Sequence, residues 1–317
     1  MQRKTVVFTF PPYEYLATQW FSGPSYVPGS FSISRFANKE VQLSVQSSVA
    51  NRSCLIVGSL SPPEENLFSF LILSHTLKKE GAKKVSAFIP YLAYSRQENE
   101  EPHKSQIAGL VGRLLKASGI DEVITVDVHS PLIKKLFPVP LHSLSPSPLF
   151  AEMIKSLSWP SCTLVAPDQG AITRCEEAAA LLHGSKEIVW VSKTRHAKGV
   201  SHSTISGKVQ ERVVIIDDIL DTGQTVISCC KKLIKEGALE IIVMVTHGLF
   251  TGTAWKKLWN LGVKKIYCTD TVPLCPRVRH EAHIFVLPIQ SLKEVFHGKA
   301  HTHSCGPNDH GRDAFHP

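Results

Sequence analysis

Two adjacent aspartates and the turn that follows them carry the clearest chemical signal in this 317-residue sequence. Four apolar residues at 213–216 lead into Asp217 and Asp218, which predicts a strand buried on both faces of a parallel sheet. The turn at 221–225 precedes a predicted helix, so its backbone N–H groups can bind a phosphate. Carboxylates there would repel a phosphate unless they bind sugar hydroxyls or a metal. The segment therefore predicts a sugar-phosphate site, with the phosphate at the turn and the diol at the carboxylates.

Polar residues also follow other predicted strands, at the carboxyl ends where open α/β sheets bind ligands. They are Arg96 and Gln97, Asp127 and His129, Asp168, and Lys193 and Arg195. Each signal is weak by itself, because a histidine after a strand is more often structural and a Lys-x-Arg pair in a polar loop is usually solvated. Their joint order and spacing make them candidates for one site.

The elements that would position these residues repeat faintly along the chain. The motif at 78–82 is echoed at 234–238, and each copy follows an amphipathic helix and precedes a strand. Gly81 and Gly237 suit the position just after a helix, where a positive φ favours glycine. The predicted helices are 65–80 and 225–236, and the predicted strands are 55–59, 84–89, 122–127, 163–167, 187–192, 213–218, 240–245 and 265–270.

Alternating strands and helices predict parallel sheets wound by helices. The sequence therefore predicts an α/β protein of two similar tandem domains, each a mostly parallel sheet flanked by helices. A Ser/Pro-rich stretch at 143–148 marks the boundary, which gives domains at 1–145 and 146–298. Residues 299–317 are rich in histidine and lack hydrophobic periodicity, so a disordered tail is favoured over a metal-binding one.

Composition narrows the class of protein. The hydrophobic content of 43% is ordinary for a soluble globular chain, and no apolar stretch is long enough to span a bilayer. The N-terminus does not read as a signal peptide, and eight cysteines without Cys-x-x-Cys spacing indicate reduced thiols. We therefore expect a cytoplasmic protein.

The net charge of +8 fits two kinds of partner, either nucleic acid or a membrane surface, or polyanionic phosphate substrates. Several lysines and arginines occur in pairs, such as Lys78–Lys79 and Lys231–Lys232, and they form no long basic run. They also do not alternate with aromatic residues in the manner of nucleic-acid-binding segments. Charge alone therefore does not decide between the two kinds of partner.

Taken together, the segments resemble the ribose-phosphate pyrophosphokinase family, also called phosphoribosyl pyrophosphate (PRPP) synthetases, over about residues 3–298. The motif at 213–225 resembles the PRPP loop that this family shares with type I phosphoribosyltransferases. The resemblance implies two tandem phosphoribosyltransferase-like domains. It also implies transfer of a pyrophosphoryl group from MgATP to the C1 hydroxyl of ribose 5-phosphate, which leaves AMP. Positioning and charge neutralisation dominate such a transfer.

The resemblance assigns roles to individual residues. Lys193 and Arg195 are implied to be catalytic, on a mobile loop that closes over the phosphates. The implied ligands of the cofactor Mg²⁺, direct or through water, are His129 and Asp168. The implied ATP-binding residues are Phe36, Asn38, Glu40, Arg96 and Gln97. The implied ribose 5-phosphate-binding residues are Asp217, which also suits a metal, Asp218, Asp221, Thr222, Gly223, Gln224 and Thr225.

The resemblance also bears on assembly and regulation. In the family the segment that contains Phe36 reaches the site of a neighbouring subunit, which implies a homo-oligomer built from dimers, with a hexamer as one option. The chain departs from the family pattern at Asn38 and Lys39, and it is acidic at 98–101 where many members are basic. The usual regulation by phosphate and ADP is therefore not implied here.

Two alternatives fit part of the same pattern. A non-catalytic regulatory subunit would keep the fold, but relatives of that kind have an interrupted catalytic loop, whereas Lys193 and Arg195 are present here. A phosphoribosyltransferase that consumes PRPP would need only one such domain. It would also lack the ATP-site segments at 36–40 and 96–97.

Overall fold

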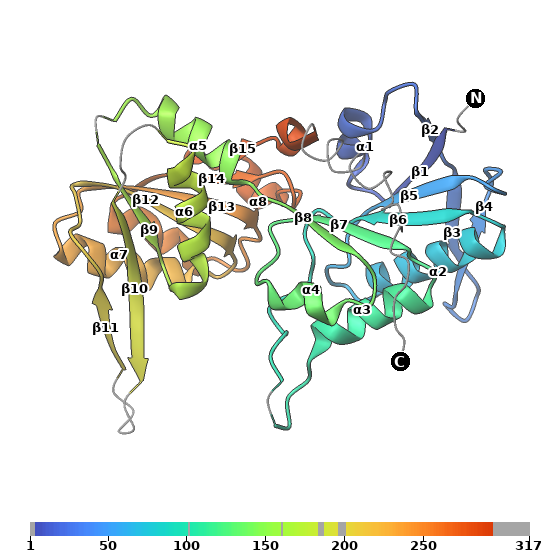
Figure 1. The fold of residues 1–317 in the computed structure, drawn as a ribbon, viewed down its shortest axis with the longest axis horizontal. Helices are drawn as coiled ribbons and strands as arrows, with labels where there is room; N and C mark the ends of the chain where they lie inside the picture. The colour runs from blue at the N-terminus through green and yellow to red at the C-terminus, as the bar shows by residue number, and fades with distance from the viewer. Residues whose placement is uncertain (1–3, 101, 160, 183–186, 196–200, 294–317) are drawn as a thin grey trace, which may run out of the picture.

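Two sheets lie side by side, each flanked by helices, in the computed structural model of the chain (Figure 1). The structure describes residues 4–100, 102–159, 161–182, 187–195 and 201–293. The predicted α/β class with two mostly parallel sheets is confirmed, whereas the predicted tail lies outside the described residues. Within the described residues, no helix combines the length and the hydropathy needed to cross a membrane.

The first sheet has the strand order β2-β1-β5-β6-β7-β8, and each neighbouring pair is parallel. Its strands are β1 (Thr5–Thr9), β2 (Tyr26–Pro28), β5 (Ser53–Val57), β6 (Lys84–Phe88), β7 (Glu122–Val126) and β8 (Leu141–Leu144). The helices of this half are α1 (Glu14–Trp20), α2 (Glu65–Lys79), α3 (Ile107–Ala117) and α4 (Leu132–Leu136). A separate antiparallel hairpin beside α2 is formed by β3 (Phe31–Arg35) and β4 (Val41–Val45).

The second sheet has the order β11-β10-β9-β12-β13-β14-β15 and is parallel except where β10 meets β11. Its strands are β9 (Thr163–Ala166), β10 (Ile188–Arg195), β11 (Ser201–Ile205), β12 (Arg212–Leu220), β13 (Glu240–Gly248), β14 (Val263–Thr269) and β15 (Ile284–Leu287). Its α-helices are α5 (Ser147–Ser156), α6 (Ile172–Ala180), α7 (Gln224–Lys235) and α8 (Pro276–Arg279). Its 3₁₀ helices are η1 (Gln169–Ala171), η2 (Ala254–Leu261) and η3 (Ile289–Leu292).

Helices on both faces of the second sheet explain the unbroken apolar run of β12. Val213 and Ile215 pack in the core that contains residues of α7 and η2, whereas Val214 and Ile216 pack with α5 and α6. Since neighbouring residues of a strand point to opposite faces, both sets must be apolar. Polar residues begin at Asp217, at the carboxyl end of this buried run.

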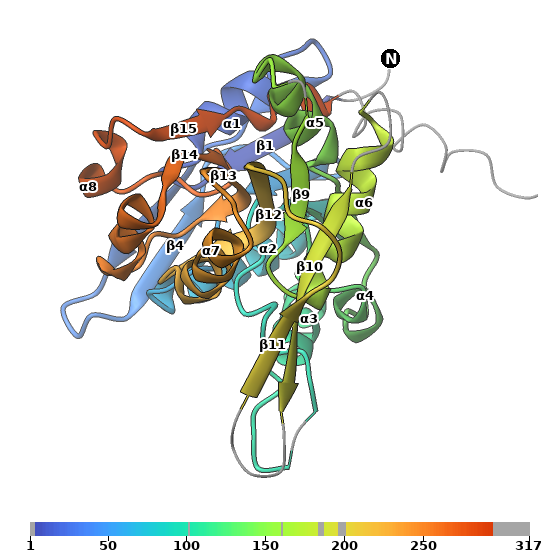
Figure 2. The ribbon, with the colours of Figure 1, turned by 90° about the vertical axis from the view of Figure 1, so that its left-hand side faces the viewer.

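The strand that contains Lys193 and Arg195 is longer than predicted. The sequence placed both residues in a loop, but β10 continues to Arg195 and pairs with β11, with Lys193 opposite Ser203 and Arg195 opposite Ser201. The two strands form a hairpin that projects from the sheet (Figure 2). The loop prediction was wrong because strand formation here depends on cross-strand pairing, which polar residues also support. The structure describes only the backbone at Lys193 and Arg195.

The two halves share apolar packing. Ile289 and Leu292 of η3 lie in the core cluster of Trp20 from α1, and Ile219 of β12 packs against the core around the first sheet. Segments of the second half therefore pack against the first half through apolar side chains. The predicted domain limits, at residues 145 and 298, remain predictions.

The reduced state expected for the cysteines remains a prediction. None forms a disulfide within the described residues, and Cys305 lies outside them. The buried cysteines are Cys54, Cys162, Cys175, Cys229, Cys230 and Cys268, and Cys275 is exposed.

We predict that Gly223→Ala destabilises the fold more than Gly237→Ala. Both glycines have a positive φ, 82° and 98°, so alanine adds backbone strain of roughly 1–2 kcal/mol at either position. A Cβ at 223 would also lie 2.9 Å from the Cα of Trp255, whereas a Cβ at 237 would meet nothing within 4 Å. We expect Gly223→Ala to lose about 1–3 kcal/mol more unfolding free energy in urea titrations. Equal losses would contradict the close approach of α7 and η2.

Candidate active site

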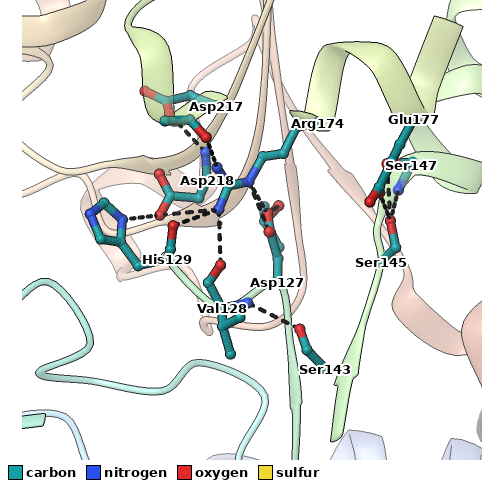
Figure 3. A network of polar contacts seen from close by, with 12 residues as sticks. Asp127, Val128, His129, Ser143, Ser145, Ser147, Arg174, Glu177, Asp217 and Asp218 are labelled. Carbon is teal, nitrogen blue, oxygen red and sulfur yellow. Dashed lines mark hydrogen bonds and ion pairs between the residues drawn. The ribbon is translucent and has the colours of Figure 1, made fainter. Parts of the chain in front are cut away.

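Polar residues of both halves meet where β7 and β12 end (Figure 3). Asp127 follows β7 of the first sheet, and Asp217 and Asp218 lie near the end of β12 in the second. Arg174 extends from α6 between them. All four residues are buried or nearly so, so their charges must be matched within the protein.

The guanidinium of Arg174 joins the two halves. Its Nε donates to both carboxylate oxygens of Asp127, at 2.8 and 3.0 Å, and the two side chains are only 10% and 8% exposed. Its Nη2 donates to the backbone carbonyls of Val128 and His129, at 3.0 and 3.3 Å, and its Nη1 to that of Gly170 at 3.1 Å. A buried ion pair is stable only when its remaining donors find partners in this way.

Asp127 has a backbone conformation that the network must hold in place. Its φ of 48° lies in the left-handed region, which aspartate tolerates better than most residues. The Thr246 hydroxyl donates to its Oδ2, and His247 Nε2 lies 3.3 Å from its carbonyl oxygen. Burial raises the pKa of Asp127 to about 6, although Arg174 opposes that rise. The carboxylate is therefore ionised at neutral pH.

His247 is a neutral structural partner of this network. Burial lowers its pKa to about 4. Because the carbonyl of Asp127 can only accept, Nε2 of His247 carries the hydrogen, and Nδ1 accepts from the hydroxyl of Thr271 at 2.8 Å. The ring also contacts Tyr91, with centroids 4.7 Å apart. His247 thus ties β13 to the end of β7.

His129 and Asp218 form the second polar link between the halves. His129 Nδ1 lies 2.6 Å from Asp218 Oδ2, and the Asp218 side chain is 7% exposed. The hydrogen bond to Asp218 raises the pKa of His129 above its ordinary value. Burial opposes ionisation of Asp218, but the hydrogen bond to His129 and the charge of Arg174 outweigh it and lower the pKa. The geometry therefore favours an imidazolium–carboxylate pair.

Asp217 lies in a different environment from its neighbour. Burial raises its pKa well above the ordinary value, and the charges of Asp218 and Asp168 raise it further. Asp168 follows β9, where its Oδ1 accepts from Gly170 N at 3.0 Å and caps η1. The two predicted residues Asp217 and Asp168 are thus close enough to interact electrostatically, as a sugar or metal site between them would require.

The predicted phosphate turn has the conformation that anion binding needs. Gly223 is the N-cap of α7, in the left-handed conformation, and no side chain caps the helix there. The helix continues for 12 residues, so its N-terminus carries a substantial partial positive charge. Thr222 and Gln224 are exposed, and Thr225 and Asp221 are half-buried. The turn can therefore present N–H groups to a solvent-borne phosphate.

Arg96 and Gln97 lie in the loop after β6, near that turn. Arg96 Nη2 is 3.0 Å from Asp221 Oδ2, so a predicted ATP-binding residue contacts a predicted ribose 5-phosphate-binding residue. A pocket of about 390 Å³ opens beside the loop, and it is lined by Arg96, Gln97, Asn99, Lys104, Ser105 and Ile107. The structure thus brings the two predicted substrate regions together.

The predicted adenine-binding segment lies apart from this group. Phe36, Asn38 and Glu40 occupy the turn of the β3–β4 hairpin, and the Phe36 side chain is 52% exposed. The hydrogen bonds described for these three residues stay within the turn, for example from Glu40 N to Asn38 Oδ1 at 3.2 Å. Within this chain, the structure does not bring the segment to the other candidates.

The described side chains do not form a closed metal site. Among the described residues, no three His, Cys, Asp or Glu side chains form a group that could hold a metal ion. Magnesium in phosphoryl-transfer sites usually keeps several waters and uses one or two carboxylates plus substrate phosphates. Asp168, whose carboxylate is not fully engaged by described partners, fits such a shared site better than a closed cage, and Nε2 of His129 could join it only once the ring has lost its extra proton.

Sequence reasoning missed Arg174 and His247. Arg174 follows Asp168 by less than two helical turns, and only its position among Cys175 and Ala178, on the apolar side of α6, hinted at burial. His247 is buried near the end of β13, after the apolar run 241–245, where a histidine needs a specific partner. Neither signal identifies the partner, because Asp127 comes from the other half of the chain.

Comparison with known proteins gives consistent matches in both halves. Residues 6–119 match the N-terminal domain of ribose phosphate pyrophosphokinase, and residues 184–294 match a phosphoribosyl synthetase-associated domain. The ribose-phosphate pyrophosphokinase of Campylobacter jejuni is 30% identical over 274 residues, which cover 84% of this chain and 88% of that protein. Ribose-phosphate pyrophosphokinase A of Dictyostelium discoideum is 28% identical over 284 residues, which cover 86% and 88%.

A solved structure is similar over nearly the whole chain. It is the phosphoribosylpyrophosphate synthetase of Mycobacterium smegmatis, with a TM-score of 0.82 and 25% sequence identity. The match covers 93% of this chain and 100% of that one. The arrangement of the two halves therefore agrees with that of a phosphoribosylpyrophosphate synthetase.

We predict that Arg174→Met is strongly destabilising. The change leaves the buried carboxylate of Asp127 without its cation, which costs about 3–5 kcal/mol. The matched control is Arg212→Met, because the pair of Arg212 and Glu240 is exposed by 40% and 43% and contributes less than about 1 kcal/mol. Chemical unfolding would compare the two variants. A loss for Arg174→Met as small as that of the control would contradict the role given to the buried pair.

We predict a pH window for the pair of His129 and Asp218. The raised pKa of His129 contributes stability below its ordinary value of 6.5 and loses it as pH rises. The lowered pKa of Asp218 contributes stability above its ordinary value of 3.8, and this stability is lost as pH falls through the lowered pKa. The stability lost in His129→Asn should therefore be largest between pH 3.8 and 6.5, in urea titrations without divalent cations. The exposed His75→Asn is the control, and a pH-independent loss would refute the ion pair.

Proposed function

Since the chain belongs to the ribose-phosphate pyrophosphokinase family, we propose that it makes PRPP and AMP from MgATP and ribose 5-phosphate. The anomeric C1 oxygen attacks the β-phosphorus, and the bond between that phosphorus and the α,β-bridging oxygen breaks. The bridging oxygen leaves with AMP, and the C1 hydroxyl loses its proton. Negative charge develops around the transferring group, so catalysis rests on positioning and charge neutralisation.

The observation that carries this proposal is the junction of β12 and α7. There, Asp217 and Asp218 precede the N-terminus of α7. Its N-cap residue, Gly223, has a positive φ, and no side chain caps the helix. The helix N-terminus suits the 5-phosphate of the substrate, through the N–H groups of Gln224 and Thr225. The carboxyl groups suit the ribose hydroxyls. Such a site binds a sugar phosphate at both of its ends.

The nucleotide is proposed to approach from the first half. Arg96 and Gln97 lie across from the turn, and a guanidinium suits phosphate oxygens because its planar fork donates two parallel hydrogen bonds. Asp168 and His129 would bind Mg²⁺ together with the substrate phosphates. Bound there, Mg²⁺ would neutralise charge on the phosphates and polarise them. Asp218 accepts from Nδ1–H of His129 and orients the ring, and Mg²⁺ at Nε2 would displace the proton that the imidazolium carries there.

Lys193 and Arg195 are proposed as the catalytic cations. They lie near the outer end of β10, on the hairpin that projects from the second sheet. A lysine point charge and an arginine fork at that position can stabilise the developing charge, provided that the hairpin closes over the site and excludes water. In the strand pairing, Lys193 lies opposite Ser203 and Arg195 opposite Ser201, so both belong to the paired part of the hairpin.

A homo-oligomer built from dimers is proposed because the β3–β4 turn is exposed and lies apart from the site in its own chain. Phe36 could stack on an adenine only if the turn entered a neighbouring subunit's site, with Asn38 and Glu40 at the base edge. The exposure of an aromatic side chain at a hairpin tip supports this arrangement. A cytoplasmic location, with neither nucleic acid nor membrane as a partner, completes the proposal.

We predict that the purified chain releases AMP from MgATP only when ribose 5-phosphate is present. A coupled assay for AMP measures this, and PRPP should form in equal amount. Lys193→Ala should lower kcat by about 100- to 1000-fold with little change in KM, because it removes a charge needed mainly in the transition state. Lys208→Ala, which alters an exposed lysine beyond β11, should behave like the unmodified chain.

Two results would count against the proposal. Folded protein that releases no AMP at any magnesium concentration would favour a non-catalytic regulatory subunit. Normal turnover by Lys193→Ala would leave the activity in place but remove the role proposed for Lys193.

A further inference from the structure

The ion pair between Arg96 and Asp221 connects the two proposed substrate regions. Nη2 of Arg96 lies 3.0 Å from Oδ2 of Asp221, and the two side chains are 47% and 25% exposed. Arg96 belongs to the loop after β6, and Asp221 to the turn between β12 and α7. The pair therefore bridges the halves at a point that solvent and ligands can reach.

Asp221 is held on a fixed backbone. The carbonyl of the preceding Leu220 accepts hydrogen bonds from Leu249 N and Phe250 N, at 2.9 and 3.0 Å. The carbonyl of Asp221 accepts a hydrogen bond from Thr251 N at 3.2 Å. Two residues earlier, Ile219 packs against the apolar core around the first sheet. The carboxylate of Asp221 is thus presented to the first half from a rigid support.

The loop of Arg96 is anchored by backbone bonds but leaves its side chain free to move. Gln97 N donates to Tyr94 O at 3.0 Å, and Ala108 N donates to Gln97 O at 3.2 Å, which ties the loop to α3. The Nε2 of Gln106 donates to Glu98 O at 2.9 Å. A long, half-exposed arginine on such a loop would sample several rotamers without a partner, so Asp221 restricts its orientation.

The bond to Asp221 leaves most of the guanidinium available. A guanidinium has five N–H donors, and the described contact with Asp221 uses one nitrogen, Nη2. The other edge can still form a bidentate contact with a phosphate. The pocket beside Arg96 and Gln97 provides room for such a ligand. A carboxylate behind a guanidinium thus fixes the direction in which its free donors point.

We propose that Asp221 is a positioning residue for the nucleotide, which orients Arg96 towards the phosphates of ATP rather than binding ribose 5-phosphate itself. This inference rests on the proposed function. It makes the turn before α7 part of both substrate sites: its N–H groups bind the sugar phosphate, and its first carboxylate acts through Arg96. Because the pair is partly exposed, its effect on affinity is modest.

The test is a double-mutant cycle read by calorimetric binding of α,β-methylene ATP with Mg²⁺. This analogue cannot react, because the methylene replaces the bridging oxygen at which ATP would be cleaved. Asp221→Ala should weaken its binding about two- to fivefold while Arg96 is intact, and Asp221→Asn should lie between. In an Arg96→Gln background, Asp221→Ala should have no further effect. Ribose 5-phosphate binding, measured separately, should change less.

The matched control is Glu281→Ala. Glu281 pairs with Lys256 at 2.6 Å, and the exposures of 49% and 26% nearly equal those of the pair under test. It should leave analogue binding unchanged. Tighter binding by Asp221→Ala, an equal loss in the Arg96→Gln background, or a larger loss for ribose 5-phosphate would each overturn the inference while leaving the proposed function intact. An unmodified chain that does not bind the analogue would instead overturn the proposed function, and this inference with it.

Discussion

The buried pair of Arg174 and Asp127 is the interaction on which the arrangement of the two halves depends. Removing both charges from water costs several kcal/mol per ion, so the pair is tolerable only if each remaining donor and acceptor is satisfied. Here the partners come from both sides: backbone carbonyls after β7 and before α6, and the hydroxyl of Thr246 from β13. Apolar packing could tolerate small shifts between the halves, but this set of bonds could not. It therefore fixes the ends of β7 and β12 against each other.

That constraint explains why candidate residues from distant parts of the chain meet. In each sheet the polar residues lie at the carboxyl ends of the strands, and either edge by itself carries only part of the candidate residues. The Arg174 network closes the distance so that His129 reaches Asp218 and Arg96 reaches Asp221. Two sheet edges that face each other could contact different ends of the substrates in the proposed reaction. The ion pairs between the two halves hold the two sheet edges next to each other.

The parts of this architecture that depend on local chemistry were predictable from the sequence. The strand of β12, its phosphate turn, and the glycines after α2 and α7 follow from periodicity and φ preferences within about a dozen residues. The role of Arg174 was not predictable, because its partner is far away in sequence and the helix pattern alone shows only that it is near an apolar face. The sequence did not predict that β10 extends past Lys193 for the same reason, because β11 supplies the backbone pairing. Local signals thus identified the candidates, and tertiary contacts decided which of them meet.

The charge balance of the junction limits what it can bind. The chain carries a net charge of +8. Among the described residues of this network, however, the carboxylates of Asp127, Asp168, Asp217, Asp218 and Asp221 outnumber the cations of Arg96, His129 and Arg174. Arg174 and His129 are committed to Asp127 and Asp218, and Arg96 is shared with Asp221. A polyphosphate could not approach Asp168 and Asp217 without further positive charge, because like charges at close range disfavour binding. This balance fits the proposal that the nucleotide arrives with a divalent cation, and in that proposal Lys193 and Arg195 of the β10–β11 hairpin meet the charge that develops during transfer.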